Sequence, residues 1–264
     1  MPTAIILAHT TQGFFIAADG RTRRDDGGVL TLLRDDQQKI FPICDDRARF
    51  AFALTGTAHF TSEGDDTDVV FDFISAIRQA ADEMKVAAHH DAVDYCNHLA
   101  ERINDLLERS VVNARQAGKR VPYPSNPSQF GNGMIAMLFL CGYYDRASCG
   151  VGVHFSHEDQ QLARPERIEF GASVISGPPN VGHLLYETDD PRFAAFRFTP
   201  LSRDPSVEEW TIIANNFVRA CESQPGIDVD PELAPGVGGH VHAATVTARD
   251  GFRWIPGFEP VGSS

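Results

Sequence analysis

The order in which predicted strands and helices alternate constrains the fold of this chain more than any other sequence feature. Short apolar runs between turn residues predict strands, and apolar residues spaced three or four apart predict helices. The predicted order is strands at 3–9, 14–18, 39–43 and 49–54, helices at 68–84 and 91–112, strands at 134–143, 150–155 and 167–174, a helix at 207–221, and strands at 241–247 and 252–255. Groups of strands separated by helices favour antiparallel sheets over βαβ units, in which strands and helices alternate singly.

This order predicts an α+β fold in the form of a four-layer αββα sandwich, with two stacked antiparallel sheets flanked by helices. The chain has 264 residues, no internal repeat and no linker, so we expect a single domain over 1–264. Residues 113–133 are rich in Pro, Ser, Asn and Gly and lack periodicity. They predict a surface-loop insertion.

Composition excludes several classes of protein. With 23 Lys and Arg against 36 Asp and Glu, the net charge is −13, which argues against nucleic acid as a partner. The apolar run at residues 4–8 is too short for a signal sequence or a membrane span, so no membrane partner is expected. Five scattered cysteines form no C-x-x-C pair, which predicts a reduced, cytoplasmic protein.

Four motifs near the N-terminus carry the chemistry. Thr3 opens the first strand, Asp19-Gly20-Arg21 ends the second, Lys39 opens the segment K-I-F-P-I, and the apolar strand 50–54 leads to Gly56. In these motifs and their order the sequence resembles the proteasome β-subunit family of N-terminal nucleophile (Ntn) hydrolases. Segments 136–144 and 238–254 are similar to later parts of the same family.

The resemblance implies a role for each residue. Thr3 would be the nucleophile, with its own free α-amine as base, because a threonine hydroxyl is a weak nucleophile unless a base is adjacent. Lys39 would lie beside Thr3 Oγ1 and lower the pKa of the hydroxyl and the amine, and Asp19 would keep Lys39 charged and oriented. Arg21 would support the turn, and the N–H of Gly56 would donate to the oxyanion.

The chain departs from the family pattern at two places. Thr3 follows Met1 and Pro2, so its nitrogen is an amide until those residues are removed. The family has two supporting Ser residues. The one in a Gly-Ser-Gly turn has its best match at Ser176, and the one just before the final Gly-Gly has no counterpart at residues 234–237. No Asp stands just before Gly238, where the family has its supporting carboxylate. Asp228, Asp230 or Glu232 could replace it only if the loop were shifted.

These expectations lead to two hypotheses of different kinds. The first is a threonine-type amide or peptide hydrolase that needs no cofactor and acts on a peptide or small amide substrate. The alternative is a non-catalytic homologue that serves as a structural or binding subunit. The resemblance also implies a homo-oligomer, as a ring or a stack built on the helices at 68–84 and 91–112, and it raises the prospect of an unfoldase partner.

Histidine-rich positions support a weaker third hypothesis, a metal-dependent hydrolase. His240 and His242 are two residues apart on a predicted strand, so their side chains point the same way. His154, His157 and Glu158 could add ligands. Because the spacing of these residues completes no known ligand set, no metal site is expected.

Overall fold

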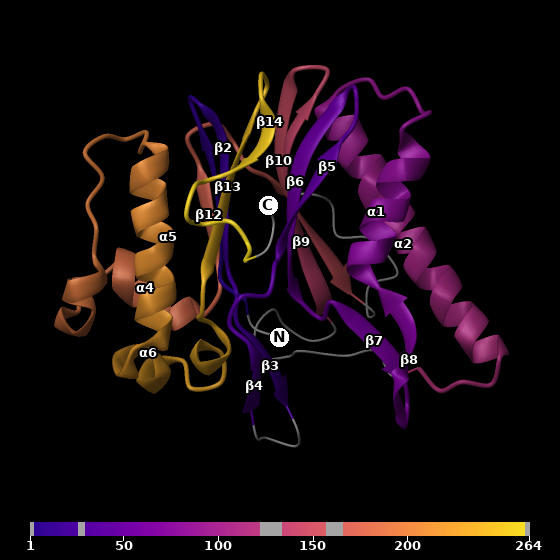
Figure 1. Ribbon diagram of the computed structural model, residues 1–264, viewed down its shortest axis with the longest axis horizontal. Helices are drawn as coiled ribbons and strands as arrows, with labels where there is room; N and C mark the ends of the chain where they lie inside the picture. The colour runs from indigo at the N-terminus through magenta and orange to yellow at the C-terminus, as the bar shows by residue number, and fades with distance from the viewer. Residues whose placement is uncertain (1–2, 26–29, 122–133, 157–165, 262–264) are drawn as a thin grey trace.

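The computed structural model describes residues 3–25, 30–121, 134–156 and 166–261. Within these ranges, two five-stranded antiparallel sheets lie against each other, and helices cover the outer face of each sheet (Figure 1). The prediction of an α+β fold with antiparallel sheets is confirmed.

The first sheet has the strand order β12-β1-β2-β13-β14. Its strands are β1 (Ile5–Thr10), β2 (Gly13–Asp19), β12 (Ser173–Ser176), β13 (Val241–Thr247) and β14 (Gly251–Trp254). The hairpin of β1 and β2 turns at Thr11 and Gln12, and Gly13 takes a φ of 126°, which favours glycine. In this hairpin Ile5 faces Ala18, so the start of β1 lies beside the end of β2.

The second sheet has the order β11-β10-β9-β6-β5. Its strands are β5 (Ile40–Cys44), β6 (Ala48–Gly56), β9 (Met134–Tyr144), β10 (Ala147–Ser156) and β11 (Glu166–Arg167). β6 and β9 pair along their whole length, so Gly56 faces Ala136 at one end and Ala48 faces Tyr144 at the other.

Two helical groups cover the sheets. α1 (Phe73–Met84) and α2 (Ala92–Gln116) pack on the second sheet, and their first turns are capped by the carboxylates of Asp72 and Asp91. α4 (Pro179–Tyr186), α5 (Val207–Glu222) and α6 (Gln224–Val229) lie on the first sheet, together with short 3-10 turns at Pro191–Phe196 and Ala234–Gly236 (Figure 1). Ser206 and Glu209 form a capping box at the start of α5.

Three apolar clusters hold these layers together. Side chains such as Leu7 and Ile16 of the first sheet meet Ala53 and Phe139 of the second. A second cluster joins the outer face of the second sheet to α1 and α2, and a third joins the outer face of the first sheet to α5 and its neighbours. Alternate residues of a strand point to opposite faces, so each sheet contributes to two clusters.

Two small hairpins depart from the predictions. No strand is predicted between residues 19 and 38, but β3 (Thr22–Asp25) pairs with β4 (Leu30–Arg34). The helix expected from residue 68 begins only at Phe73, because β8 (Asp65–Asp72) pairs with β7 (His59–Ser62). The Asp72 side chain caps α1 at the point where the strand ends.

Two further boundaries are corrected. The strand expected at 167–174 is divided, since Gly171 takes a φ of 76° and sends β11 to one sheet and β12 to the other. Residues 113–116, expected in a loop, form the last turn of α2. The rest of that expected loop falls largely on residues 122–133, which lie outside the described residues.

Two further observations concern the length of the helices and the state of the cysteines. No described helix combines the length and the apolar character needed to cross a bilayer. All five cysteines lie in described segments and are free thiols.

Candidate active site

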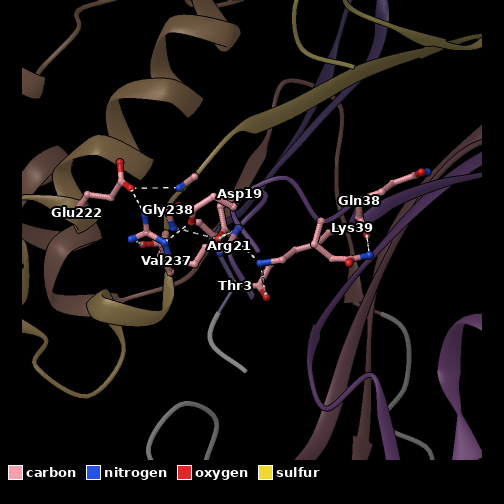
Figure 2. Close-up of polar contacts among 12 residues, drawn as sticks. Thr3, Asp19, Arg21, Gln38, Lys39, Glu222, Val237 and Gly238 are labelled. Atoms are coloured by element: carbon pink, nitrogen blue, oxygen red, sulfur yellow. Dashed lines mark hydrogen bonds and ion pairs between the residues drawn. The ribbon is translucent and has the colours of Figure 1, made fainter. Parts of the chain in front are cut away.

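The ends of three chain segments bring Thr3, Asp19 and Lys39 together (Figure 2). Thr3 lies two residues before β1, Asp19 is the last residue of β2, and Lys39 directly precedes β5. The ammonium group of Lys39 donates to Asp19 Oδ1 at 2.9 Å and to Thr3 Oγ1 at 3.3 Å. Because β1 and β2 form one hairpin, Thr3 and Asp19 are neighbours by local structure, whereas Lys39 comes from the opposite sheet.

Asp19 is fully buried and accepts four hydrogen bonds. Oδ1 accepts from Lys39 and from the N–H of Ala4 at 2.9 Å, and Oδ2 accepts from the N–H groups of Arg21 at 3.2 Å and Gly238 at 3.1 Å. Burial raises the pKa of Asp19, and the Lys39 ammonium and the backbone donors oppose that rise. Four N–H donors around one carboxyl group favour its ionised form.

Lys39 is 9% exposed, and burial lowers the pKa of its ammonium group, while the charge of Asp19 opposes the shift. The ammonium is therefore held between one carboxylate and one hydroxyl. A cation at this distance stabilises an alkoxide that forms on Thr3 Oγ1. The same group can take up or return a proton more readily than a solvent-exposed lysine.

Arg21 joins the end of β2 to the loop before β13. Its guanidinium group donates to Asp35 Oδ1 and to Glu222 Oε1, each at 2.7 Å, and to the carbonyl of Val237 at 3.2 Å (Figure 2). Gly238 packs directly on this group, since a Cβ at that position would lie 2.5 Å from the guanidinium carbon. Arg21 thus positions the loop whose N–H donates to Asp19.

Glu222 and Asp35 are the partners that the sequence analysis missed. Glu222 lies at the end of α5 and also accepts from the N–H of Gly239 at 3.1 Å. Asp35 accepts the N–H of His240 through its backbone carbonyl at 2.7 Å. Neither residue belongs to a motif, and Glu222 is far from Arg21 in sequence, so no local pattern could have assigned it.

Gly56 ends β6 opposite Ala136, at the end of the second sheet where Lys39 also lies near the start of β5. Its φ is 92°, and a Cβ there would lie 2.7 Å from the carbonyl oxygen of Ile135. Both facts require glycine for reasons within the protein itself. The role expected for its N–H toward an oxyanion stays a prediction.

Ser176 lies on β12 directly opposite Ile5, two residues beyond Thr3 in the chain. Its hydroxyl is buried and has no hydrogen-bond partner among the described residues. The serine borders a pocket of about 620 Å³ between β12 and α4, whose walls include Met137, Phe139, His183 and Phe217. An apolar pocket that begins beside the N-terminal strand can accept a side chain of a substrate.

The carboxylates considered as substitutes have other partners. Asp230 is buried, and its side chain accepts from the N–H of Val181 at 2.9 Å and from Asn180 Nδ2 at 2.8 Å, so it fixes the first turn of α4. Asp228 accepts from Gln224 Nε2 at 2.7 Å on α6. Neither carboxylate has Thr3 among its hydrogen-bond partners.

The histidines considered as metal ligands are arranged differently from that hypothesis. His240 and His242 have ring centroids 5.1 Å apart, and His240 Nε2 lies 3.2 Å from the carbonyl oxygen of Glu259. His242 is completely buried with no partner for either ring nitrogen among the described residues, and burial lowers its pKa to about 4. His154 borders the pocket of Ser176, and residues 157 and 158 lie outside the described residues.

Comparisons with known proteins give little further support. No model of a protein family matches the chain, and no curated protein matches it. Among solved structures, it is similar to a mutant of Anbu from Hyphomicrobium sp. strain MC1, a proteasome-related protein with an Ntn-like fold. The TM-score is 0.47 at 11% identity, over 96% of this chain and 84% of that chain.

Membership in the proteasome β-subunit family, expected from the sequence, is a wrong prediction. The motifs at Thr3, Asp19, Lys39 and Gly56 are short and degenerate, and the likeness to Anbu is too low to assign the chain to that family. A TM-score below 0.5 carries no inference about activity or assembly.

Proposed function

We propose that this chain is an amide hydrolase of the Ntn type, with Thr3 as the nucleophile. The observation that carries the proposal is the position of the Lys39 ammonium group, which contacts Thr3 Oγ1 and the buried Asp19 at once. A lysine with a purely structural role would need only the Asp19 carboxylate as its partner. The second contact directs positive charge to an oxygen that becomes negative during attack.

The reaction follows from these positions. Thr3 Oγ1 attacks the carbonyl carbon of the substrate amide and gives its proton to the free α-amine of Thr3, and Lys39 stabilises the developing charge on Oγ1. The tetrahedral intermediate collapses to a Thr3 ester, and the leaving amine takes the proton. Water then attacks the ester, which returns the acid product and the free hydroxyl.

The α-amine exists only after residues 1 and 2 have been removed, and both lie outside the described residues. The proposal therefore includes this processing step. An N-terminal mass that begins at Thr3 supports it. A mass that retains Pro2, with no amide hydrolysis, supports the second candidate, a non-catalytic binding protein, which the presence of Pro2 before Thr3 favours.

The substrate expected for the hydrolase is a peptide or small amide whose side chain enters the pocket beside Ser176. A panel of acyl-peptide amides with small, large apolar and charged side chains tests this expectation. Hydrolysis should be abolished by Thr3→Ala and partly kept by Thr3→Ser, since serine retains the hydroxyl and the amine. Equal activity of wild type and Thr3→Ala would overturn the proposal.

Expectations about partners and location remain proposals. A homo-oligomer built on α1 and α2 is tested by light scattering of the purified chain. The free thiols of all five cysteines favour a reducing compartment, and the predicted cytoplasmic location rests on them alone.

A further inference from the structure

Three side chains capable of binding a metal ion meet on the outer side of the second sheet, where α1 connects to α2. His89 lies in the connection, and Asp94 and His98 lie on the first turns of α2. The Nδ1 atoms of the two histidines are 3.2 Å apart. Asp94 Oδ1 is 3.7 Å from His98 Nδ1, and Asp94 Oδ2 is 3.8 Å from His89 Nδ1.

These separations suit a tetrahedral metal ion. Zinc binds nitrogen and oxygen ligands at about 2.0–2.1 Å, so adjacent ligand atoms of a tetrahedron lie about 3.3 Å apart. The three ligand atoms already lie within 4.8 Å of one another. We propose that His89, Asp94 and His98 bind one divalent transition metal ion of the zinc type.

The local structure holds the ligands in place. Asp91 caps α2 by accepting from the N–H groups of Val93 and Asp94, which fixes where the helix begins. Asp94 and His98 are four residues apart and share one face of the helix. These two ligands are therefore set by helix geometry alone.

His89 is fixed by the aromatic residues behind it. Its backbone N–H donates to Tyr144 Oη at 3.3 Å, and its ring lies edge-to-face against Tyr95 and Tyr144 with centroids 5.2 and 5.3 Å away. The side chain is 2% exposed. His89 is the one ligand that sequence spacing does not bring to the helix face, so tertiary packing supplies it.

The hydrogen-bonding state of the cluster also fits a cation. His89 Nε2 is buried with no partner among the described residues, so Nδ1 is the nitrogen that faces polar groups. Asp94 Oδ2 accepts from the backbone N–H of His90 at 2.9 Å, and this bond orients the carboxylate. Two facing Nδ1 atoms can share either a hydrogen bond or a bound cation, and the negative charge of the adjacent carboxylate attracts a cation.

The donor set identifies the class of ion. Two imidazoles and one carboxylate suit zinc and neighbouring transition metals, whereas magnesium and calcium prefer oxygen ligands. His98 is half exposed, so the fourth position of the tetrahedron is open to water. Such an ion would tie the connection between α1 and α2 to the first turns of α2.

The cluster is separate from the candidate active site. Tyr144, which contacts His89, lies at the end of the β6–β9 pair opposite to Gly56. Metal binding at this cluster is therefore independent of the proposed hydrolase activity, and it is measured by binding and stability alone.

The binding experiment uses the full chain after treatment with a chelator. Co²⁺ and Zn²⁺ are titrated by visible absorption and by competition with a chromogenic chelator, and one ion per chain is expected. His98→Gln should weaken binding at least about 10-fold, because it removes one of three ligands while leaving the buried His89 in place. His183→Gln is the matched control. It removes a histidine paired with Glu187 at 2.9 Å across the same helical spacing and should leave binding unchanged.

Thermal unfolding gives a second readout. At free Zn²⁺ about 100-fold above Kd, the Tm should rise by about 5–10 °C in wild type and in His183→Gln, and by much less in His98→Gln. Binding that is no tighter in wild type than in His98→Gln would overturn the proposal and leave a histidine–histidine hydrogen bond in its place.

Discussion

Lys39 Nζ lies 2.9 Å from Asp19 Oδ1, and both side chains are buried between the ends of the two sheets. Removal of one charge leaves the other uncompensated in a site with little access to water. The pair can therefore be replaced together with less loss of stability than either member alone. Comparing the stability and the activity of the single and double variants therefore separates the structural role of the pair from its catalytic role.

Substitution of Lys39 by Met should lower the free energy of unfolding by about 3–5 kcal/mol, because Asp19 then remains as an unpaired buried carboxylate. Urea denaturation measures this loss. Hydrolysis should fall to the level of Thr3→Ala, since no cation remains beside Thr3 Oγ1.

The double variant Asp19→Asn with Lys39→Met is the control for this prediction. It should recover most of the stability lost in Lys39→Met and none of the activity. Recovery of hydrolysis in the double variant would show that Lys39 has no part in the reaction.

Substitution of Gly238 by Ala tests the loop that Arg21 positions. The new Cβ would lie 2.5 Å from the Arg21 guanidinium carbon and 2.3 Å from Glu222 Oε1, at a φ of 147°. We expect a loss of about 1–3 kcal/mol in urea denaturation. The kcat should fall more than KM rises, because Asp19 loses a donor while the pocket is untouched.

Gly64 provides a matched comparison for Gly238. Its φ is 85°, and apart from Gly64 itself and its two chain neighbours no atom lies within 4 Å of a Cβ built there. Gly64→Ala therefore keeps the cost of the backbone conformation without the collision. An equal effect of both substitutions on kcat would contradict a positioning role for the Arg21 loop.

His242 predicts a dependence of stability on pH. Its pKa is lowered by burial to about 4, while an exposed histidine in the unfolded chain titrates near 6.5. Between these values the unfolded chain binds more protons, so the stability of the folded chain decreases as the pH falls through this window. At pH 5 the loss due to His242 is about 2 kcal/mol relative to pH 7.5.

Chemical denaturation of wild type and His242→Leu at both pH values measures this loss of stability. The leucine variant cannot take up a proton, so the two proteins should differ by about 2 kcal/mol more at pH 5 than at pH 7.5, in favour of the variant. Other titrating groups are common to both proteins and cancel in the difference. Parallel pH profiles would show that His242 is already solvated in the native protein.

Gly182 lines the pocket beside Ser176, so a side chain introduced at this position would enter the pocket. It lies inside α4, and apart from its chain neighbours and the nearby backbone of α4, the nearest atom to a Cβ built there would be Phe217 Cε2, at 3.9 Å. Gly182→Leu should fill part of the pocket and raise KM for amides with large apolar side chains, with little effect on small ones. Gly182→Ala is the control, and it should leave specificity unchanged while stabilising the helix by about 0.5–1 kcal/mol.

Much of the sheet structure could be predicted from the sequence because the strands are short apolar runs bounded by turn residues. The hairpin of β1 and β2 and the pairing of β13 with β14 follow from local pattern alone. The start of α1 could not be predicted in this way. Val70 continues the helical spacing of Phe73 and Ile77, but it lies in a strand. The pairing of β8 with β7 decided that boundary.

The candidate active site could be predicted in part from the sequence for a similar reason. Thr3 lies just before the hairpin that Asp19 ends, and Lys39 directly precedes the apolar strand β5. The partners of Arg21 could not be predicted, because Glu222 lies on a helix that is far from Arg21 in the sequence. The His89 cluster shows the same limit, since Asp94 and His98 share a helix face but only tertiary packing adds His89.

In the proposed reaction, Thr3 Oγ1 forms a covalent ester with the substrate. Treatment of the purified chain with an acylating electrophile directed at N-terminal threonine, followed by intact mass measurement and peptide mapping, tests it most directly. We predict one adduct per chain on a peptide that begins at Thr3, and none in Thr3→Ala or Lys39→Met. An unmodified chain that still begins at Met1 or Pro2, or an adduct that persists in Thr3→Ala, would contradict the account.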